Sequence, residues 1–243
     1  GGGVGGRAPF RIEGGWLDPI VSKKRQVLRE SGLNILLDGP QGCGKTVLAR
    51  SIADSLGMTF VFFNCGAVVE ASDFLVAIQV RASSTGAPVT DFVKTDVLTA
   101  LEDAGDHPER RYLVFLDELN RCQESARNAL MPALDSTRRV FHPIENTFIP
   151  IPENVQFIAA VNRGRELSGT FGIDAAQLDR FAPLQMDYPP QRAEIEILTK
   201  RYPEISNANL DIIVTVANAI RQAADLPGTL SVRATDEACV YLK

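Results

Sequence analysis

The sequence contains few of the residues that organise cross-linked or metal-bound folds. Among 243 residues there are only two histidines, and the four cysteines show no C-x-x-C spacing: Cys43, Cys65, Cys122 and Cys239. This scatter argues against a zinc site and a disulfide framework, and it is typical of a reducing compartment. We therefore expect a cytoplasmic protein held together by an apolar core.

Long hydrophobic runs and an excess of positive charge are also missing. No stretch approaches the ~18 consecutive apolar residues of a membrane span, and residues 1–6 form a glycine-rich linker without a signal-peptide core. The chain has 25 Lys and Arg against 30 Asp and Glu, a net charge of −5. Because neutralising phosphates needs clustered basic residues, nucleic acid is a disfavoured partner, and we expect no membrane partner.

What is present is the composition of an ordinary folded protein, with 45% hydrophobic and 23% charged residues. Short apolar β-type runs alternate with helical patterns over most of the chain. The β-type runs are 34–37, 59–64, 112–116, 155–161 and 184–186, and the helical patterns are 45–56, 95–104 and 123–134. Apolar strands separated by helices predict an α/β fold, with a five-stranded parallel sheet flanked by helices.

Three features modify this simple alternation. Turn-rich segments inside 78–93 and 139–150 predict two β-hairpins, and Pro132 should kink the third helix or end it early. After Tyr188-Pro189-Pro190 only helical patterns remain. We therefore expect a partly flexible segment at 1–30, an α/β nucleotide-binding domain at 31–190, and a small helical lid, compact or truncated, at 191–243.

A phosphate-binding motif follows the first β-type run and opens a helix, as G-x-x-x-x-G-K-[ST] requires. Its glycines let backbone N–H groups turn toward phosphates, and the helix N-terminus adds partial positive charge. Lys45 can then reach the β- and γ-phosphates of ATP, and the Thr46 hydroxyl can ligate Mg²⁺. The predicted nucleotide contacts here are Gly39, Pro40, Gln41, Gly42, Cys43, Gly44, Lys45, Thr46 and Val47.

Polar residues end two later strands of the predicted sheet. Asp117 and Glu118 follow the run 112–116, and Asn162 follows 155–161. Ligands bind at the carboxyl ends of parallel strands, so we expect Asp117 to hold Mg²⁺ and Glu118 to deprotonate the attacking water. Asn162 can contact the γ-phosphate or that water from the side opposite Glu118, although Asn is also a common turn residue.

Arg180 ends a short helical segment immediately before the last strand. An arginine there can stabilise charge on a transferring phosphoryl group. The alternative is a structural ion pair with Asp179 or Glu118.

With these segments in order, residues 34–233 resemble the AAA+ ATPases, and within them the MoxR group with its CbbQ and NorQ type activases. The resemblance rests mainly on Leu116–Arg121 and Leu178–Phe181. It implies that Asn162 is the sensor 1 residue, Arg180 an arginine finger and Arg233 the sensor 2 residue. Many relatives have Asn-Pro after the sensor 1 strand, where this chain has Asn162-Arg163, so Arg163 could contact a neighbouring subunit.

The same resemblance implies what the protein does. It predicts a homo-oligomeric ring, most simply a hexamer, that hydrolyses Mg-ATP to remodel a protein substrate, with a von Willebrand A domain protein as a partner class. The two hairpins would face the pore of the ring. Two alternatives stay open at this point: a nucleic-acid-processing motor of the McrB or MCM kind, and a nucleotide-gated scaffold with little turnover.

Overall fold

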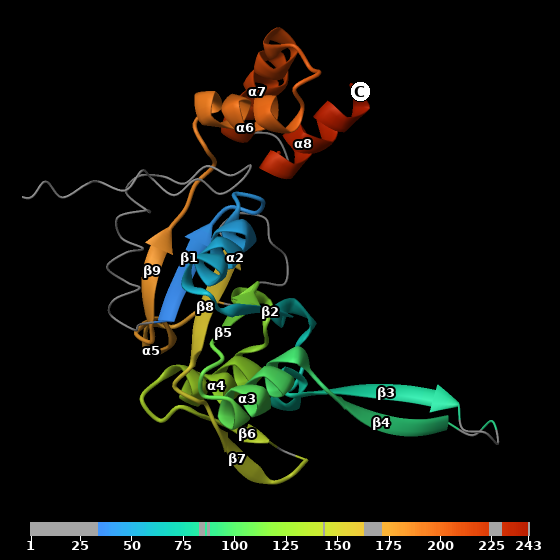
Figure 1. The fold of residues 1–243 in the computed structure, drawn as a ribbon, viewed down its shortest axis with the longest axis vertical. Helices are drawn as coiled ribbons and strands as arrows, with labels where there is room; N and C mark the ends of the chain where they lie inside the picture. Colours follow the sequence, from blue (N-terminus) through green and yellow to red (C-terminus); the bar gives the residue numbers. More distant parts are fainter. Residues whose placement is uncertain are drawn as a thin grey trace, which may run out of the picture.

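A computed structural model describes residues 34–82, 86, 88–142, 144–162, 172–223 and 230–242. Its centre is a five-stranded sheet of parallel strands in the order β2-β5-β8-β1-β9 (Figure 1). The strands are β1 (Asn34–Gly39), β2 (Thr59–Asn64), β5 (Tyr112–Asp117), β8 (Val155–Asn162) and β9 (Phe181–Gln185). The predicted fold class is confirmed.

Helices cover both faces of this sheet because successive residues of each strand point to opposite sides. Leu113 and Phe115 of β5 pack in one apolar cluster with α2 (Lys45–Leu56). Val114 and Leu116 pack in the other cluster with α3 (Asp96–Asp106) and α4 (Glu124–Leu134). The apolar runs of β1, β5 and β8 are therefore strands buried on both faces, whereas the edge strands β2 and β9 are only partly buried.

Two details of the helices bear on the sequence analysis. The α4 helix does not end early at Pro132 but continues for two more residues to Leu134, although proline has no N–H to donate to the carbonyl four residues before it. The Thr137 hydroxyl donates to the Pro132 carbonyl at 2.9 Å and helps to close that end. Val47, a predicted nucleotide contact, is 49% exposed, since the buried stripe of α2 runs through Leu48 and Ile52.

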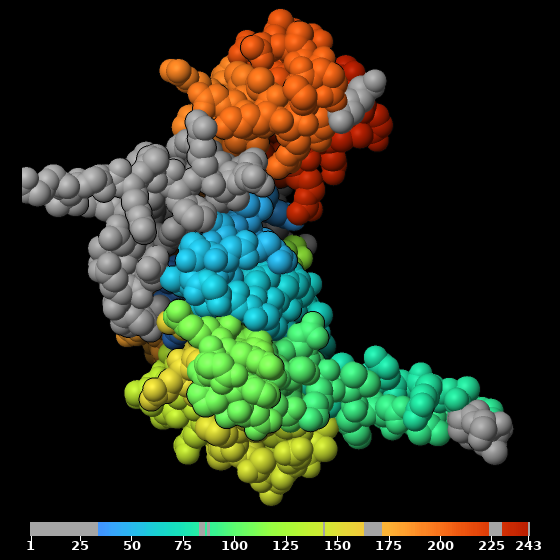
Figure 2. Space-filling model, viewed as in Figure 1, coloured from blue at the N-terminus to red at the C-terminus, as the bar shows by residue number. Residues whose placement is uncertain are grey.

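Both predicted hairpins are present, with part of each turn outside the described residues. The first consists of β3 (Val76–Ala82) and β4 (Pro88–Lys94), which extend from the body as an arm (Figures 1 and 2). The second consists of β6 (Arg139–His142) and β7 (Thr147–Pro150). Three short 3-10 turns were not predicted: η1 (Cys65–Ala67), η2 (Ala71–Phe74) and η3 (Leu119–Arg121).

The C-terminal helices have an apolar cluster of their own, centred on Leu198, Leu210 and Val214. They are α6 (Gln191–Arg201), α7 (Asn207–Gln222) and α8 (Val232–Tyr241), and they lie beyond the carboxyl ends of β1 and β9 (Figure 1). Across the described residues, no helix has the length and apolarity needed to cross a membrane. All four cysteines are buried and free.

Candidate functional site

The loop between β1 and α2 has the backbone that its glycines permit. Gly42 and Gly44 adopt φ values of 74° and 98°, in the left-handed region where a side chain would be strained. Lys45, the first residue of α2, donates from Nζ to the carbonyls of Gly39 at 2.9 Å and Pro40 at 2.7 Å. The lysine side chain therefore lies across the inside of the loop, with Thr46 following in the first helical turn.

Burial shifts the ionisation of the groups around this loop. Lys45 is 6% exposed, and burial lowers the pKa of its ammonium, although the Cys43 thiol and the Asp117 carboxylate oppose the shift. Burial raises the pKa of Cys43, with Lys45 opposing it. Burial also raises the pKa of Asp117, and the neighbouring Glu118 carboxylate adds to the effect. The charged groups of the loop and of the end of β5 therefore influence one another's ionisation.

Glu118 is held in an unusual backbone conformation directly after β5. Its φ of 54° and ψ of 41° are left-handed, which is uncommon for a residue other than glycine. Its N–H donates to the Asp117 carboxylate at 3.0 Å. Gly66 lies so close that a Cβ there would come within 3.0 Å of Glu118 Oε2. The backbone conformation of Glu118 thus sets the direction of its carboxylate, and the close approach of Gly66 limits the movement of that carboxylate.

Both carboxylate oxygens of Glu118 accept hydrogen bonds. Asn162 Nδ2 donates to Oε1 at 3.2 Å, and Arg121 donates to Oε2 at 3.1 Å. Asn120 in turn donates to the Asn162 carbonyl at 3.1 Å and fixes the end of β8. Asn162 is 9% exposed and is the last residue of β8 rather than a turn residue.

The structure brings Glu118 and Asn162 together because parallel strands end at one edge of the sheet. The sequence predicted that both residues lie at this edge, but it placed Asn162 on the side of the water opposite Glu118, whereas the two side chains are in direct contact. Arg121 and Asn120 were missed as contacts, although both belong to the segment that carries the family resemblance. The spacing of three residues between Glu118 and Arg121 is the only sequence signal for their pairing. Arg163, proposed for a neighbour contact, lies outside the described residues.

Arg180 lies elsewhere, in the turn after α5 (Ala175–Leu178). Its guanidinium donates to the Ala176 carbonyl and lies 3.5 Å from the Asp135 carboxylate. The ion-pair alternative named the wrong acids, because the partner is Asp135 rather than Asp179 or Glu118. Asp135 follows α4 and is 45 residues from Arg180 in the sequence, so no local sequence pattern predicts that the two residues pair.

The C-terminal helices approach the phosphate-binding loop closely. A Cβ on Gly42 would lie 2.2 Å from the Cβ of Ser231, which caps α8 by accepting from the N–H of Ala234. Arg233 is exposed in the first turn of that helix, and in the described part of the chain it makes no hydrogen bond or ion pair. A cavity of about 970 Å³ opens beside the loop, lined by Pro40, Met186, Asp187, Tyr188, Pro189, Pro190, Gln191, Asn218, Arg221 and Gln222.

Comparison with known proteins shows which family the chain belongs to. The family described as "AAA domain (dynein-related subfamily)" matches residues 34–181, which is more than half of the chain. "Putative chaperone BssE" of Thauera aromatica is 27% identical over 89% of this chain and 71% of its own length. An uncharacterised protein of Staphylococcus saprophyticus is 26% identical over 70% of this chain, but the match spans only 62% of that relative.

Among solved structures, the Thermotoga maritima RuvB Holliday junction branch migration motor aligns with a TM-score of 0.57. The alignment covers 91% of this chain and 60% of that chain at 18% identity, so it shows a shared AAA+ fold alone. AAA domains are generally P-loop ATPases that bind nucleotide, typically Mg-ATP, and that oligomerise. On the match to residues 34–181, this chain belongs to the AAA domain family, in its dynein-related subfamily.

Proposed function

We propose that this chain hydrolyses Mg-ATP at the interfaces between subunits of a ring, most simply a hexamer, and uses the energy to remodel or help assemble a partner protein, as MoxR-type chaperones and activases do. The observation that carries the proposal is the contact of Glu118 with Asn162 at the edge of the sheet where the phosphate-binding loop also lies. A chain that only binds nucleotide needs the loop but has no need for these residues.

Each residue of the site has a task in this proposal. The loop N–H groups and Lys45 bind the β- and γ-phosphates, and 191–243 acts as a lid over the nucleotide. Glu118 accepts the proton of the attacking water while the bond between the γ-phosphorus and the β–γ bridging oxygen breaks, so ADP leaves. Asn162 orients that water or the γ-phosphate. Arg233 senses the phosphates from α8.

Magnesium fits the donor set when ATP supplies the remaining ligands. Across the described residues, no cluster of three or more Asp, Glu, His or Cys could hold a metal alone. Thr46 and Asp117 offer one hydroxyl and one carboxylate, and Mg²⁺ usually takes one or two such ligands plus substrate phosphates and waters. An ion held by these two residues would supply positive charge that offsets the charge developing on the phosphates.

The β3–β4 arm supports the proposal of a protein substrate. Ile78 and Phe92 are paired across the two strands and are 64% and 56% exposed, and Val80, on the same face, is 70% exposed. A contiguous apolar face on a projecting hairpin is typical of a protein contact rather than of a solvated surface. The von Willebrand A domain class of partner and the cytoplasmic location rest on the MoxR resemblance and on the free cysteines.

Glu118→Gln tests the hydrolysis proposal, because the substitution keeps the volume but removes the proton acceptor. We expect ATP affinity close to wild type and phosphate release slower by about 10²–10⁴-fold. Steady-state phosphate release and equilibrium binding of ATP are the measurements. Unchanged turnover in the variant would place the base elsewhere. A wild-type protein that binds ATP without releasing phosphate would favour the nucleotide-gated scaffold instead.

A further inference from the structure

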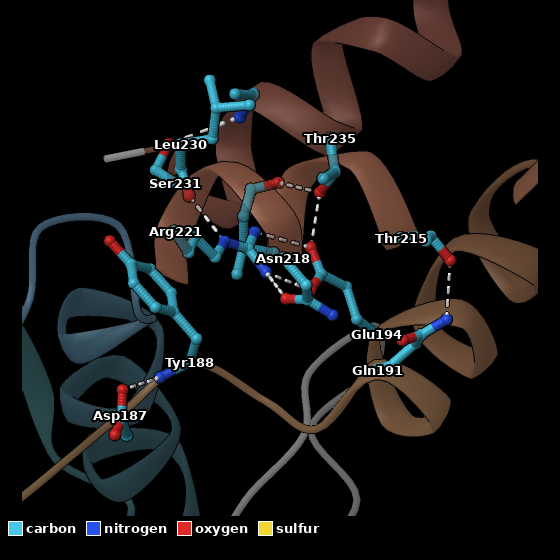
Figure 3. A network of polar contacts seen from close by, with 12 residues as sticks. Asp187, Tyr188, Gln191, Glu194, Thr215, Asn218, Arg221, Leu230, Ser231 and Thr235 are labelled. Atoms are coloured by element: carbon cyan, nitrogen blue, oxygen red, sulfur yellow. Dashed lines mark hydrogen bonds and ion pairs between the residues drawn. The ribbon is translucent and has the colours of Figure 1, made fainter. Parts of the chain in front are cut away.

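Tyr188 connects the phosphate-binding loop to the C-terminal helices. It lies in the segment 186–190 between β9 and α6, and its hydroxyl donates to the Gln41 carbonyl at 3.0 Å. The Arg221 guanidinium lies over the tyrosine ring, 4.6 Å from its centroid (Figure 3). One side chain thus contacts the loop at one end and α7 along its face.

Arg221 is a fixed support for that ring. Its two terminal nitrogens donate to the two carboxylate oxygens of Glu194 at 2.7 and 2.9 Å, and its Nε donates to the Leu230 carbonyl at 2.6 Å (Figure 3). Thr235 of α8 donates to the same carboxylate at 2.7 Å. The side chains of Arg221 and Glu194 are 5% and 0% exposed. Because this network joins α6, α7 and α8, the position of the tyrosine follows the position of all three helices.

The hydroxyl contact fixes the orientation of one peptide group in the loop. No cis peptide bond occurs in the described chain, so the Gln41 carbonyl and the Gly42 N–H point in opposite directions. With the carbonyl bonded to Tyr188, the N–H points away from it. Within the described residues the Gly42 N–H donates to no other group. A backbone donor that is oriented but unpaired, in a loop of this type, is available to an anionic oxygen.

We propose that Tyr188 is a positioning residue for phosphate binding, whose hydroxyl holds the Gln41–Gly42 peptide with its N–H directed at a phosphate oxygen of the nucleotide. The C-terminal helices set the position of this hydroxyl through Arg221. The inference rests on the proposed ATP site and extends it. It links the position of the C-terminal helices to the binding of the phosphates rather than to the binding of the adenine.

The test is Tyr188→Phe, which keeps the ring over Arg221 and removes only the hydroxyl. Binding of ATP and of inorganic tripolyphosphate, which has no base, is measured by calorimetry. We expect both dissociation constants to rise by the same factor, about 3- to 10-fold, as for one lost hydrogen bond. The KM for ATP should rise with kcat near the wild-type value.

Two further variants serve as references. Tyr202→Phe removes another tyrosine hydroxyl, which bonds Asp236 within the C-terminal helices at 3.0 Å, and should leave both dissociation constants unchanged. Lys45→Ala should abolish binding of both ligands. If Lys45→Ala still binds ATP as the wild type does, the proposed function fails. If Lys45→Ala loses binding while Tyr188→Phe keeps it, only the present inference fails.

Two outcomes would overturn the role of Tyr188. Weaker ATP binding with unchanged tripolyphosphate binding would mean that the hydroxyl serves the nucleoside. A Tyr188→Phe variant that fails to fold would mean that the hydroxyl serves the fold rather than the loop.

Discussion

Two arginine ion pairs in this molecule differ in how firmly they are held. Arg221 and Glu194 are 5% and 0% exposed and share two contacts of 2.7 and 2.9 Å. Arg180 and Asp135 are 30% and 26% exposed and share one contact of 3.5 Å. A buried charge has no other partner available, whereas a partly exposed one can exchange its partner for water or for an incoming anion. Arg221 therefore serves to hold the helices together, whereas the guanidinium of Arg180 can leave Asp135 and bind another anion.

Arg221→Met should produce the largest loss of stability in this comparison. The substitution keeps much of the apolar stem but leaves the Glu194 carboxylate buried without its counter-charge, a defect that typically costs about 3–5 kcal/mol. For a chain of this size that corresponds to a fall in Tm of about 2–4 °C for each kcal/mol. Thermal unfolding followed by circular dichroism checks it.

A double variant sharpens the same point. Replacing Glu194 by Gln in the Arg221→Met background removes the unpaired charge, so it should recover part of the lost stability. A double variant no more stable than Arg221→Met would show that the cost arises from packing and not from the buried charge.

Asp135→Asn should have the smallest effect on stability, about 0–1 kcal/mol, because the pair that it breaks is partly exposed. Burial alone would raise the pKa of Asp135, but hydrogen bonds from Thr137 and the charge of Arg180 outweigh it and lower the pKa below 3.8. An acid with a lowered pKa adds stability above its unfolded pKa and loses it as pH falls through the folded value. Any difference in Tm between wild type and variant should therefore shrink below about pH 4, and a difference that grows on acidification would contradict this assignment.

The sequence predicts the fold well because local patterns determine it. The bounds of α2 and of β2 agree with prediction residue for residue, since the helix opens directly after the phosphate-binding glycines and β2 is a short run rich in Phe and Val. The meeting of Glu118 and Asn162 follows from strand order alone, because both end neighbouring strands at one edge. The last strand was placed too late, at 184–186 instead of Phe181–Gln185, because Pro183 interrupts its pattern.

What the sequence could not provide are contacts that depend on packing between distant elements. Glu194 and Arg221 are 27 residues apart and meet only because three helices pack around them. The Tyr188 contact with Gln41 spans 147 residues and depends on where the C-terminal helices sit. Nothing in the sequence around these residues indicates their contacts, which can be seen only in the folded structure.

The central claim, hydrolysis between subunits, is tested most directly by mixing two inactive variants. If Arg180 acts on the neighbour's ATP, Arg180→Ala should bind ATP nearly normally but hydrolyse it about 10³–10⁵-fold more slowly, and Lys45→Ala should not bind it. In mixed rings, the intact loop of an Arg180→Ala subunit meets the intact Arg180 of a Lys45→Ala neighbour. We predict that verified mixed rings release phosphate faster than either variant alone. Mixed rings no faster than the single variants, or full activity of Arg180→Ala alone, would contradict the account.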